Sequence, residues 1–359
     1  MAAGPAMVDW DVAVSTANRL LRPGPEVSRS EAGAAVRSLL ELAGVADGHV
    51  RNLTHLEPVG ALTPVRIVDR PGWVATNAAG FDRLMGPLIE RVTAKRPAPP
   101  GRVAATIGPR VTGTQTGLLL AFLAGKVLGQ YDVFGPAGGE LLLVAPNIVE
   151  AERTLAVDPH DFRLWVCLHE CTHRLQFTAV PWLADHMRSE VEALVDALEL
   201  DPKVLRERLG LVVRELSSAV RGRGSGEGLL ALIQGEDARA AMDRITAFMS
   251  LVEGHAEYVM DAVGPLVVPQ IATIRRKFSA RRRGSSAADR LLRRLLGLDV
   301  KMRQYAEGGT FVRRVVDTAG MDAFNAVWRS PSNLPLRSEL ADPAAWIERV
   351  HGTVPAVEG

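Results

Sequence analysis

The sequence predicts a predominantly helical α+β protein with a small β-sheet. Apolar residues recur every three or four positions over long stretches, which is the period of an amphipathic helix. Two short runs, 65–68 and 140–144, instead show the residue types and lengths of strands. With 47% hydrophobic and 23% charged residues among 359, the chain has the composition of a globular protein with an ample core.

The first hundred residues are expected to be helical with one strand. Segments 9–21 and 30–42 carry apolar residues at helical spacing. Residues 65–68 (VRIV) alternate and are β-branched, and the following Asp-Arg-Pro-Gly turns the chain. Helical spacing resumes over 73–93, and the proline-rich segment 95–101 predicts a loop.

The centre of the chain combines a buried helix, a strand and a capped helix. Residues 112–128 are strongly apolar and predict a helix buried on all sides. Residues 140–144 (ELLLV) predict a strand. Asp158 can cap the next helix and Pro159 suits its first turn, so this helix begins there and runs to about Phe177.

The second half of the chain is expected to be helical. Helices are predicted at 184–200 and 202–221, followed by a glycine-rich break at 222–226. A long helix with one apolar stripe is predicted over 237–263, and the Gly-Pro pair after it should end it.

Residues 169–173 (HECTH) carry the HExxH pattern, the most informative feature of the chain. Four residues turn an α-helix by about 400°, so His169 and His173 lie one turn apart on nearly the same face. This spacing lets two imidazoles bind one Zn²⁺ ion at ~2.0–2.1 Å. Glu170 can then take a proton from water and deliver it to a leaving nitrogen. The pattern predicts a zinc-dependent hydrolase.

A catalytic zinc needs a third protein ligand and an open position. The metzincin completion, HExxHxxGxxH, is excluded because Gln176 and Ala179 occupy the required glycine and histidine positions. The best downstream candidate is the segment 251–258 (LVEGHAEY).

This segment resembles the gluzincin clan, in which a glutamate on a later helix is the third zinc ligand. Aminopeptidase-like members have Asn-Glu-Gly-Phe/His-x-x-Tyr there, which residues 253–258 match except that Val252 replaces the asparagine. The resemblance implies Glu253 as ligand, with Glu257 as an acid that orients a ligating histidine. The exopeptidase signature Gly-x-Met-Glu-Asn is absent, so substrate-end specificity does not carry over.

A second way of aligning the segment with known gluzincins leaves two glutamates as candidates for the third ligand. In thermolysin-like gluzincins an aspartate follows the ligand glutamate by four residues, and Glu257 with Asp261 fits that pattern as well. Glu253 is favoured, because Gly254 permits a close helix approach at the metal.

Two further features follow from the same resemblance. Tyr305 follows Glu253 by an interval like that of the aminopeptidase tyrosine, which implies stabilisation of the oxyanion; the alternative is a buried structural tyrosine. The strand at 140–144 precedes the motif helix and is a candidate for the edge strand that pairs with an extended peptide.

A narrower resemblance covers nearly the whole chain. Residues 157–166 (VDPHDFRLWV), 169–177 (HECTHRLQF), 253–258 (EGHAEY) and 301–305 (KMRQY) look like an uncharacterised zincin-like metallopeptidase family. The family is common in actinobacteria and is sometimes associated with deazaflavin-cofactor biosynthesis. The resemblance implies a mainly helical zincin-like fold and no particular substrate.

Composition limits the partners. A net charge of +1 gives no global attraction to nucleic acid, and the arginine-rich segment 275–294 has almost no aromatic residues for base stacking. The N-terminus lacks the features of a secretory signal, and no apolar run is long enough to cross a bilayer. We therefore expect a cytoplasmic protein without membrane or nucleic-acid partners; its oligomeric state stays open.

The function predicted from the sequence is that of a zinc metallopeptidase acting on a peptide or protein substrate, with Glu170 as general base. The alternative is a catalytically silent zinc-bearing protein that binds a peptide or a partner. We expect one catalytic unit made of two lobes: residues 1–180, ending with the HExxH helix, and residues 181–359, which carry the third ligand.

Overall fold

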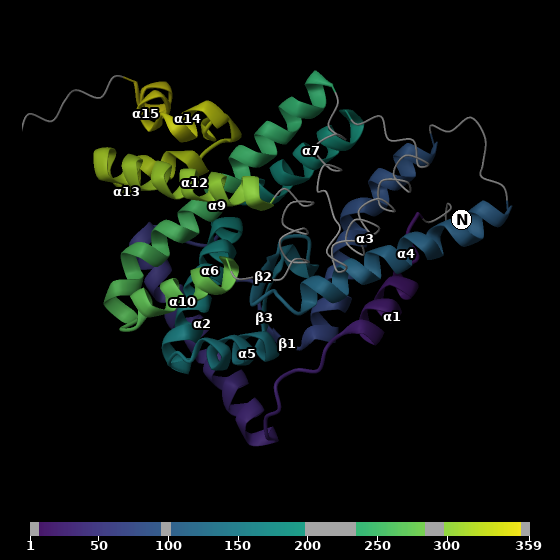
Figure 1. Cartoon of the computed structure of the whole chain (residues 1–359). Helices are drawn as coiled ribbons and strands as arrows, with labels where there is room; N and C mark the ends of the chain where they lie inside the picture. Colours follow the sequence, from purple (N-terminus) through teal and green to yellow (C-terminus); the bar gives the residue numbers. More distant parts are fainter. Residues whose placement is uncertain (1–6, 95–101, 198–234, 284–297, 353–359) are drawn as a thin grey trace, which may run out of the picture.

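A computed structural model describes residues 7–94, 102–197, 235–283 and 298–352, and it shows a mostly helical α+β fold around one small sheet (Figure 1). The expected fold class is therefore confirmed. The predicted loop at 95–101, helix at 202–221 and glycine-rich break at 222–226 lie outside the described residues. The division into two lobes stays a prediction.

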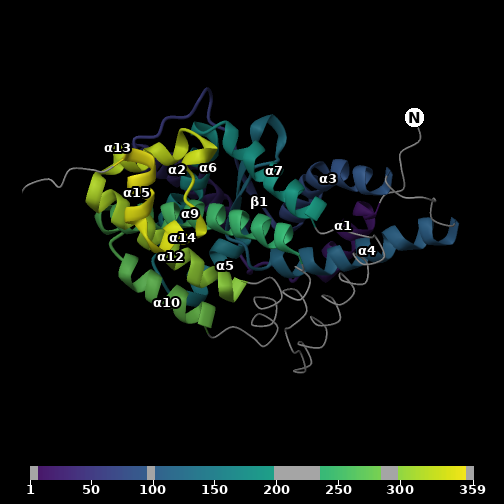
Figure 2. The ribbon, with the colours of Figure 1, turned by 90° about the horizontal axis from the view of Figure 1, so that it is seen from above.

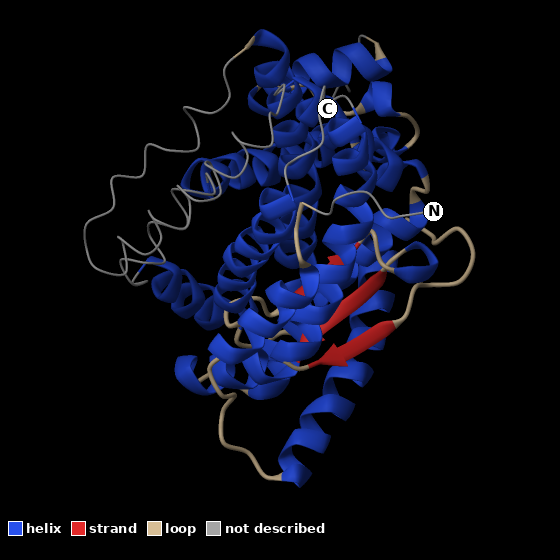
Figure 3. Cartoon of the chain, turned by 90° about the vertical axis from the view of Figure 1, so that its right-hand side faces the viewer, coloured by secondary structure: helices blue, strands red, loops and turns tan. Residues whose placement is uncertain are grey.

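Three strands form the sheet in the order β1-β3-β2, shown in red in Figure 3. Strand β1 (Val65–Val68) pairs in parallel with β3 (Glu140–Val144), and β2 (Gly129–Asp132) pairs with β3 in an antiparallel direction. Strands β1 and β3 confirm the sequence analysis. The expectation that β3 is an edge strand is wrong, because β2, which was not predicted, pairs along its other side.

The two faces of β3 contribute to different parts of the core. Leu141 and Leu143 belong to the hydrophobic cluster formed with α2 (Arg29–Thr54), α5 (Ala145–Leu155) and α6 (Pro159–Ala179). Leu142 and Val144 pack instead on the opposite face with residues of α1 (Trp10–Leu20), α3 (Arg70–Ala94) and α4 (Arg102–Ala124). Successive side chains of a strand point to opposite faces, so a strand buried on both sides reads as the continuous apolar run seen here.

Helix α6 (Pro159–Ala179), which carries the HExxH motif, begins as the sequence predicts. The Asp158 side chain accepts a hydrogen bond from the backbone N–H of Asp161 at 3.0 Å, and Pro159 occupies the first turn. The helix packs against α2 (Arg29–Thr54), where the thiols of Cys167 and Cys171 are buried and free. This contact anchors the side of α6 that faces away from the histidines.

Helix α9 (Glu236–Val267) packs against both α6 and α12 (Leu298–Ala319). It continues three residues past Gly264, where it was expected to end. Pro265 lacks only its own N–H and lies in the last turn, which the hydrogen bond from Val268 N to Gly264 O closes at 2.8 Å.

The remaining helices surround this centre. Helices α1, α3 and α4 lie at one end of the molecule and α12 to α15 at the other, as the view from above shows (Figure 2). They are α1 (Trp10–Leu20), α3 (Arg70–Ala94), α4 (Arg102–Ala124), α5 (Ala145–Leu155), α7 (Trp182–Ala197), α10 (Ile271–Arg283), α13 (Met321–Phe324), α14 (Arg337–Ala341) and α15 (Pro343–His351). Among the described residues, no helix combines the length and apolarity needed to cross a membrane.

Glycines allow α9 and α12 to cross at backbone contact. A Cβ atom on Gly254 would lie 2.2 Å from the backbone carbon of Gly308, and one on Gly308 would lie 1.9 Å from the carbonyl oxygen of Ser250. Only residues without a side chain fit here. The close approach expected at Gly254 from the sequence is thus to helix α12.

Replacing Gly254 by alanine should destabilise the protein. Because the clash is with backbone, the helices must separate, and we expect a loss of about 1–3 kcal/mol in the free energy of unfolding measured with urea. Gly44→Ala is the matched control: its Cβ would meet nothing within 4 Å on α2. It should gain about 0.5–1 kcal/mol from helix propensity. Equal stability of the two variants would contradict the crossing.

Candidate metal centre

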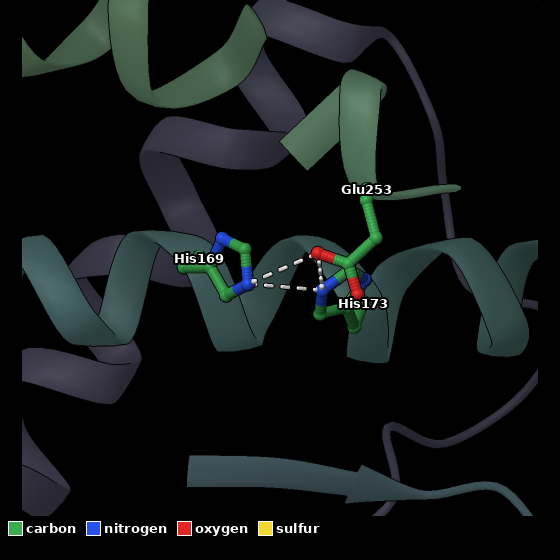
Figure 4. Close-up of side chains that lie close together, drawn as sticks. All are labelled: His169, His173 and Glu253. Atoms are coloured by element: carbon green, nitrogen blue, oxygen red, sulfur yellow. Dashed lines mark hydrogen bonds and ion pairs between the residues drawn. The ribbon is translucent and has the colours of Figure 1, made fainter. Parts of the chain in front are cut away.

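Two histidines of α6 and one glutamate of α9 converge on a single point (Figure 4). The Nε2 atoms of His169 and His173 are 3.2 Å apart. Oε2 of Glu253 lies 3.7 Å from the first of these atoms and 3.8 Å from the second. The three ligand atoms therefore face a common centre.

The positions of the three ligand residues follow from the geometry of α6 and from the packing of α9 against it. The i, i+4 spacing places both imidazoles on one face of α6, as the motif predicts. Helix α9 crosses that face, so Glu253 reaches the histidines from a helix that begins more than 50 residues after α6 ends. The structure brings Glu253, and not its rival Glu257, to the histidine pair.

This donor set suits a zinc ion. Two imidazole nitrogens and one carboxylate oxygen form a three-ligand combination found in catalytic zinc sites. Ligand atoms that share a tetrahedral ion at ~2.0–2.1 Å lie about 3.3 Å from one another, close to the separations here. The side chains of His169 and Glu253 are 32% and 26% exposed, so the cluster is open to solvent on one side.

Glu170 lies next to the cluster in a buried position. A Cβ on Gly129 of β2 would come within 2.6 Å of Cγ of Glu170, so only glycine at that position leaves room for this side chain. Burial, with a smaller contribution from the Glu253 carboxylate, raises the pKa of Glu170 to about 8. A nearby cation would lower this pKa again, because it favours the ionised carboxylate.

Gln176 is the residue that sequence reasoning missed. Its Oε1 lies 3.0 Å from Nδ1 of His173, and its Nε2 lies 2.9 Å from the carbonyl oxygen of Val252 and 3.0 Å from Nδ1 of His255. In the sequence Gln176 served only to exclude the metzincin pattern. Its position one turn after His173 is the signal that could have identified it.

His255 is a buried histidine behind the cluster. Its ring stacks on Phe324 with a centroid distance of 5.3 Å and is completely inaccessible to solvent. Burial, and to a lesser extent the nearby His173, lowers the pKa of His255 to about 3. The ring is therefore neutral at ordinary pH.

The remaining predicted site residues are Glu257, which lies outside the three-residue cluster, and Tyr305. Glu257 is exposed on α9, and its Oε2 lies 3.3 Å from where a Cβ on Gly309 would be. The atom that faces Nδ1 of His173 is instead the acceptor Oε1 of Gln176. Tyr305 lies in α12, but its side chain is outside the described part of the structure, so its role stays a prediction.

The sequence matches the zincin-like metallopeptidase family over residues 8–347. The chain belongs to this family. A solved structure from Chloroflexus aurantiacus, described as "a putative hydrolase with a novel fold", is similar with 28% identity and a TM-score of 0.70; the match covers 97% of this chain and 100% of that one. A search of curated proteins gives no match. Membership implies a metal, and the cluster on α6 and α9 fits one.

The metal-free protein should lose stability as the pH rises, because of Glu170. Between the ordinary pKa of 4.5 and the raised pKa of about 8, the folded state holds a proton on Glu170 that the unfolded state has released. Rising pH therefore favours unfolding of the wild type. Glu170→Gln has no carboxyl proton to release on unfolding. Its melting temperature relative to wild type should therefore increase from about pH 5 to about pH 8. A difference that is constant or that falls would reject the raised pKa.

Proposed function

We propose that this protein is a zinc-dependent peptidase in which His169, His173 and Glu253 hold the metal and Glu170 is the general base. The observation that carries the proposal is the convergence of three ligand atoms from two packed helices beside a buried glutamate. Membership of the zincin-like metallopeptidase family supports the same chemistry.

Each residue has a defined task in this proposal. Zinc held at such a site lowers the pKa of its water and polarises the scissile carbonyl. Glu170 accepts a proton from the attacking water and passes it to the leaving nitrogen. A cation at the cluster would favour the ionised carboxylate of Glu170, which is the form that can accept this proton.

Among the described strands, none pairs with the outer side of β2, and this edge suggests how a peptide would be held. The N–H of Val144 donates to the carbonyl oxygen of Leu128 at 2.8 Å, and bonded positions alternate along an antiparallel pair. The backbone groups of Gly129 and Tyr131 therefore point away from β3. An extended peptide that added a strand here would pass beside Glu170, which packs on Gly129.

Two further roles from the sequence analysis belong to this proposal. Tyr305 would stabilise the oxyanion of the tetrahedral intermediate. Glu257, four residues after Glu253 on α9, would orient a ligating histidine. Both are tested by replacing the residue in an active preparation.

Zinc content tests the ligand set. Purified wild type should contain one zinc per chain, and His169→Ala and Glu253→Ala should lose most of it, because two ligands hold zinc far more weakly than three. Glu257→Gln tests the rival ligand and should lose less zinc than Glu253→Ala, because Glu257 lies outside the three-residue cluster. If Glu253→Ala kept the metal and Glu257→Gln lost it, the ligand would be Glu257.

Hydrolysis of an unstructured peptide library tests the role of Glu170. Glu170→Gln should keep its zinc and lose about 10²–10⁴-fold in kcat, the usual contribution of a general base. Retained turnover would remove Glu170 from this role. If zinc-loaded wild type bound peptides and cleaved none, the catalytically silent binding protein would replace the peptidase.

A further inference from the structure

We propose that Gln176 is a positioning residue that fixes the tautomer of His173 and holds the turn of α9 carrying Glu253 in register with α6. The inference rests on the proposed metal site. Gln176 is fully buried, so water does not compete for its amide. Among the described residues, its side chain forms hydrogen bonds with His173 and with two residues of α9, Val252 and His255. These two residues lie on either side of Glu253 in the sequence.

The carbonyl of Val252 determines which way the amide points. A carbonyl oxygen only accepts hydrogen bonds, so the amide atom 2.9 Å from Val252 O must be the nitrogen, which carries two hydrogens. With the amide reversed, two oxygens would face each other at that distance in a buried position. Such an arrangement is repulsive and leaves both oxygens unsatisfied.

The amide orientation then fixes the proton on His173. Oε1 of Gln176 faces Nδ1 of His173 at 3.0 Å and can only accept. Nδ1 must therefore carry the hydrogen, which leaves the lone pair of the neutral ring on Nε2. Nε2 is the atom that faces His169 and Glu253, and a metal ligand must present its lone pair there.

The same amide joins the two helices that supply the ligands. The Val252 carbonyl belongs to the peptide unit that precedes Glu253, so the bond from Gln176 fixes the backbone from which that carboxylate projects. The second hydrogen of Nε2 goes to Nδ1 of His255, two residues after Glu253. Gln176 of α6 is thus hydrogen-bonded to α9 at a residue before Glu253 and at a residue after it.

Two substitutions separate these roles. Gln176→Glu keeps an oxygen that can accept from Nδ1 of His173 but has no hydrogen for Val252 O, whereas Gln176→Leu has neither. Thr172→Val is the matched control, since Thr172 is equally buried on α6 and its hydroxyl donates only within the helix, to Leu168 O at 2.7 Å.

The first readout is the dissociation constant for Zn²⁺, measured by competition with a chelator. Gln176→Leu should weaken binding about 10–100-fold, the usual effect of losing the partner of a ligating histidine. Gln176→Glu should fall between Gln176→Leu and wild type, and Thr172→Val should bind as wild type does. Circular dichroism checks that each variant is folded. Equal affinity of Gln176→Leu and Thr172→Val would overturn the inference.

The second readout uses the metal-free wild-type protein, so it depends neither on zinc binding nor on the folding of a variant. Nitrogen-15 NMR of histidine-labelled, metal-free wild type reports the tautomer, and His173 should carry its hydrogen on Nδ1. A hydrogen on Nε2 would overturn the inference. If zinc binding and the tautomer behaved as expected while no peptide was cleaved, the role of Gln176 would stand and the peptidase proposal would fall.

Discussion

The packing of α9 between α6 and α12 determines the whole site. On one side, Gly254 and Gly308 bring the backbones of α9 and α12 into contact, and on the other, Gln176 of α6 binds the carbonyl of Val252. Neither contact tolerates a larger or differently polar residue, so α9 has little freedom to slide or rotate. Glu253 reaches the histidines because its helix is fixed on both faces.

The electrostatics of the site are unfavourable without a cation. Glu170 is buried, and burial together with the nearby Glu253 carboxylate disfavours the ionised form of Glu170. A divalent ion at the three-residue cluster reverses this, because it stabilises both negative charges. Metal binding and deprotonation of Glu170 are therefore coupled, and occupancy of the site also sets the protonation state of this carboxyl group.

Features encoded locally could be predicted from the sequence, and features that depend on distant partners could not. The start of α6 follows from Asp158 and Pro159, and the histidine pair follows from helix geometry alone. Strand β2 was missed because its sequence, GQYD, has low strand propensity and gains its order from pairing with β3. The role of Gln176 depends on a carbonyl 76 residues later in the chain, which no local pattern contains.

The two buried cysteines of α6 affect how the protein reacts with oxidants and alkylating reagents and which metals it can bind. Burial raises the pKa of Cys171 to about 12 and that of Cys167 well above its ordinary value. Only thiolates attack oxidants and alkylating reagents or capture soft metals. These thiols stay protonated, so the folded protein should withstand air and iodoacetamide without a reducing agent. Copper(I) and cadmium would likewise find only nitrogen and oxygen donors at the cluster.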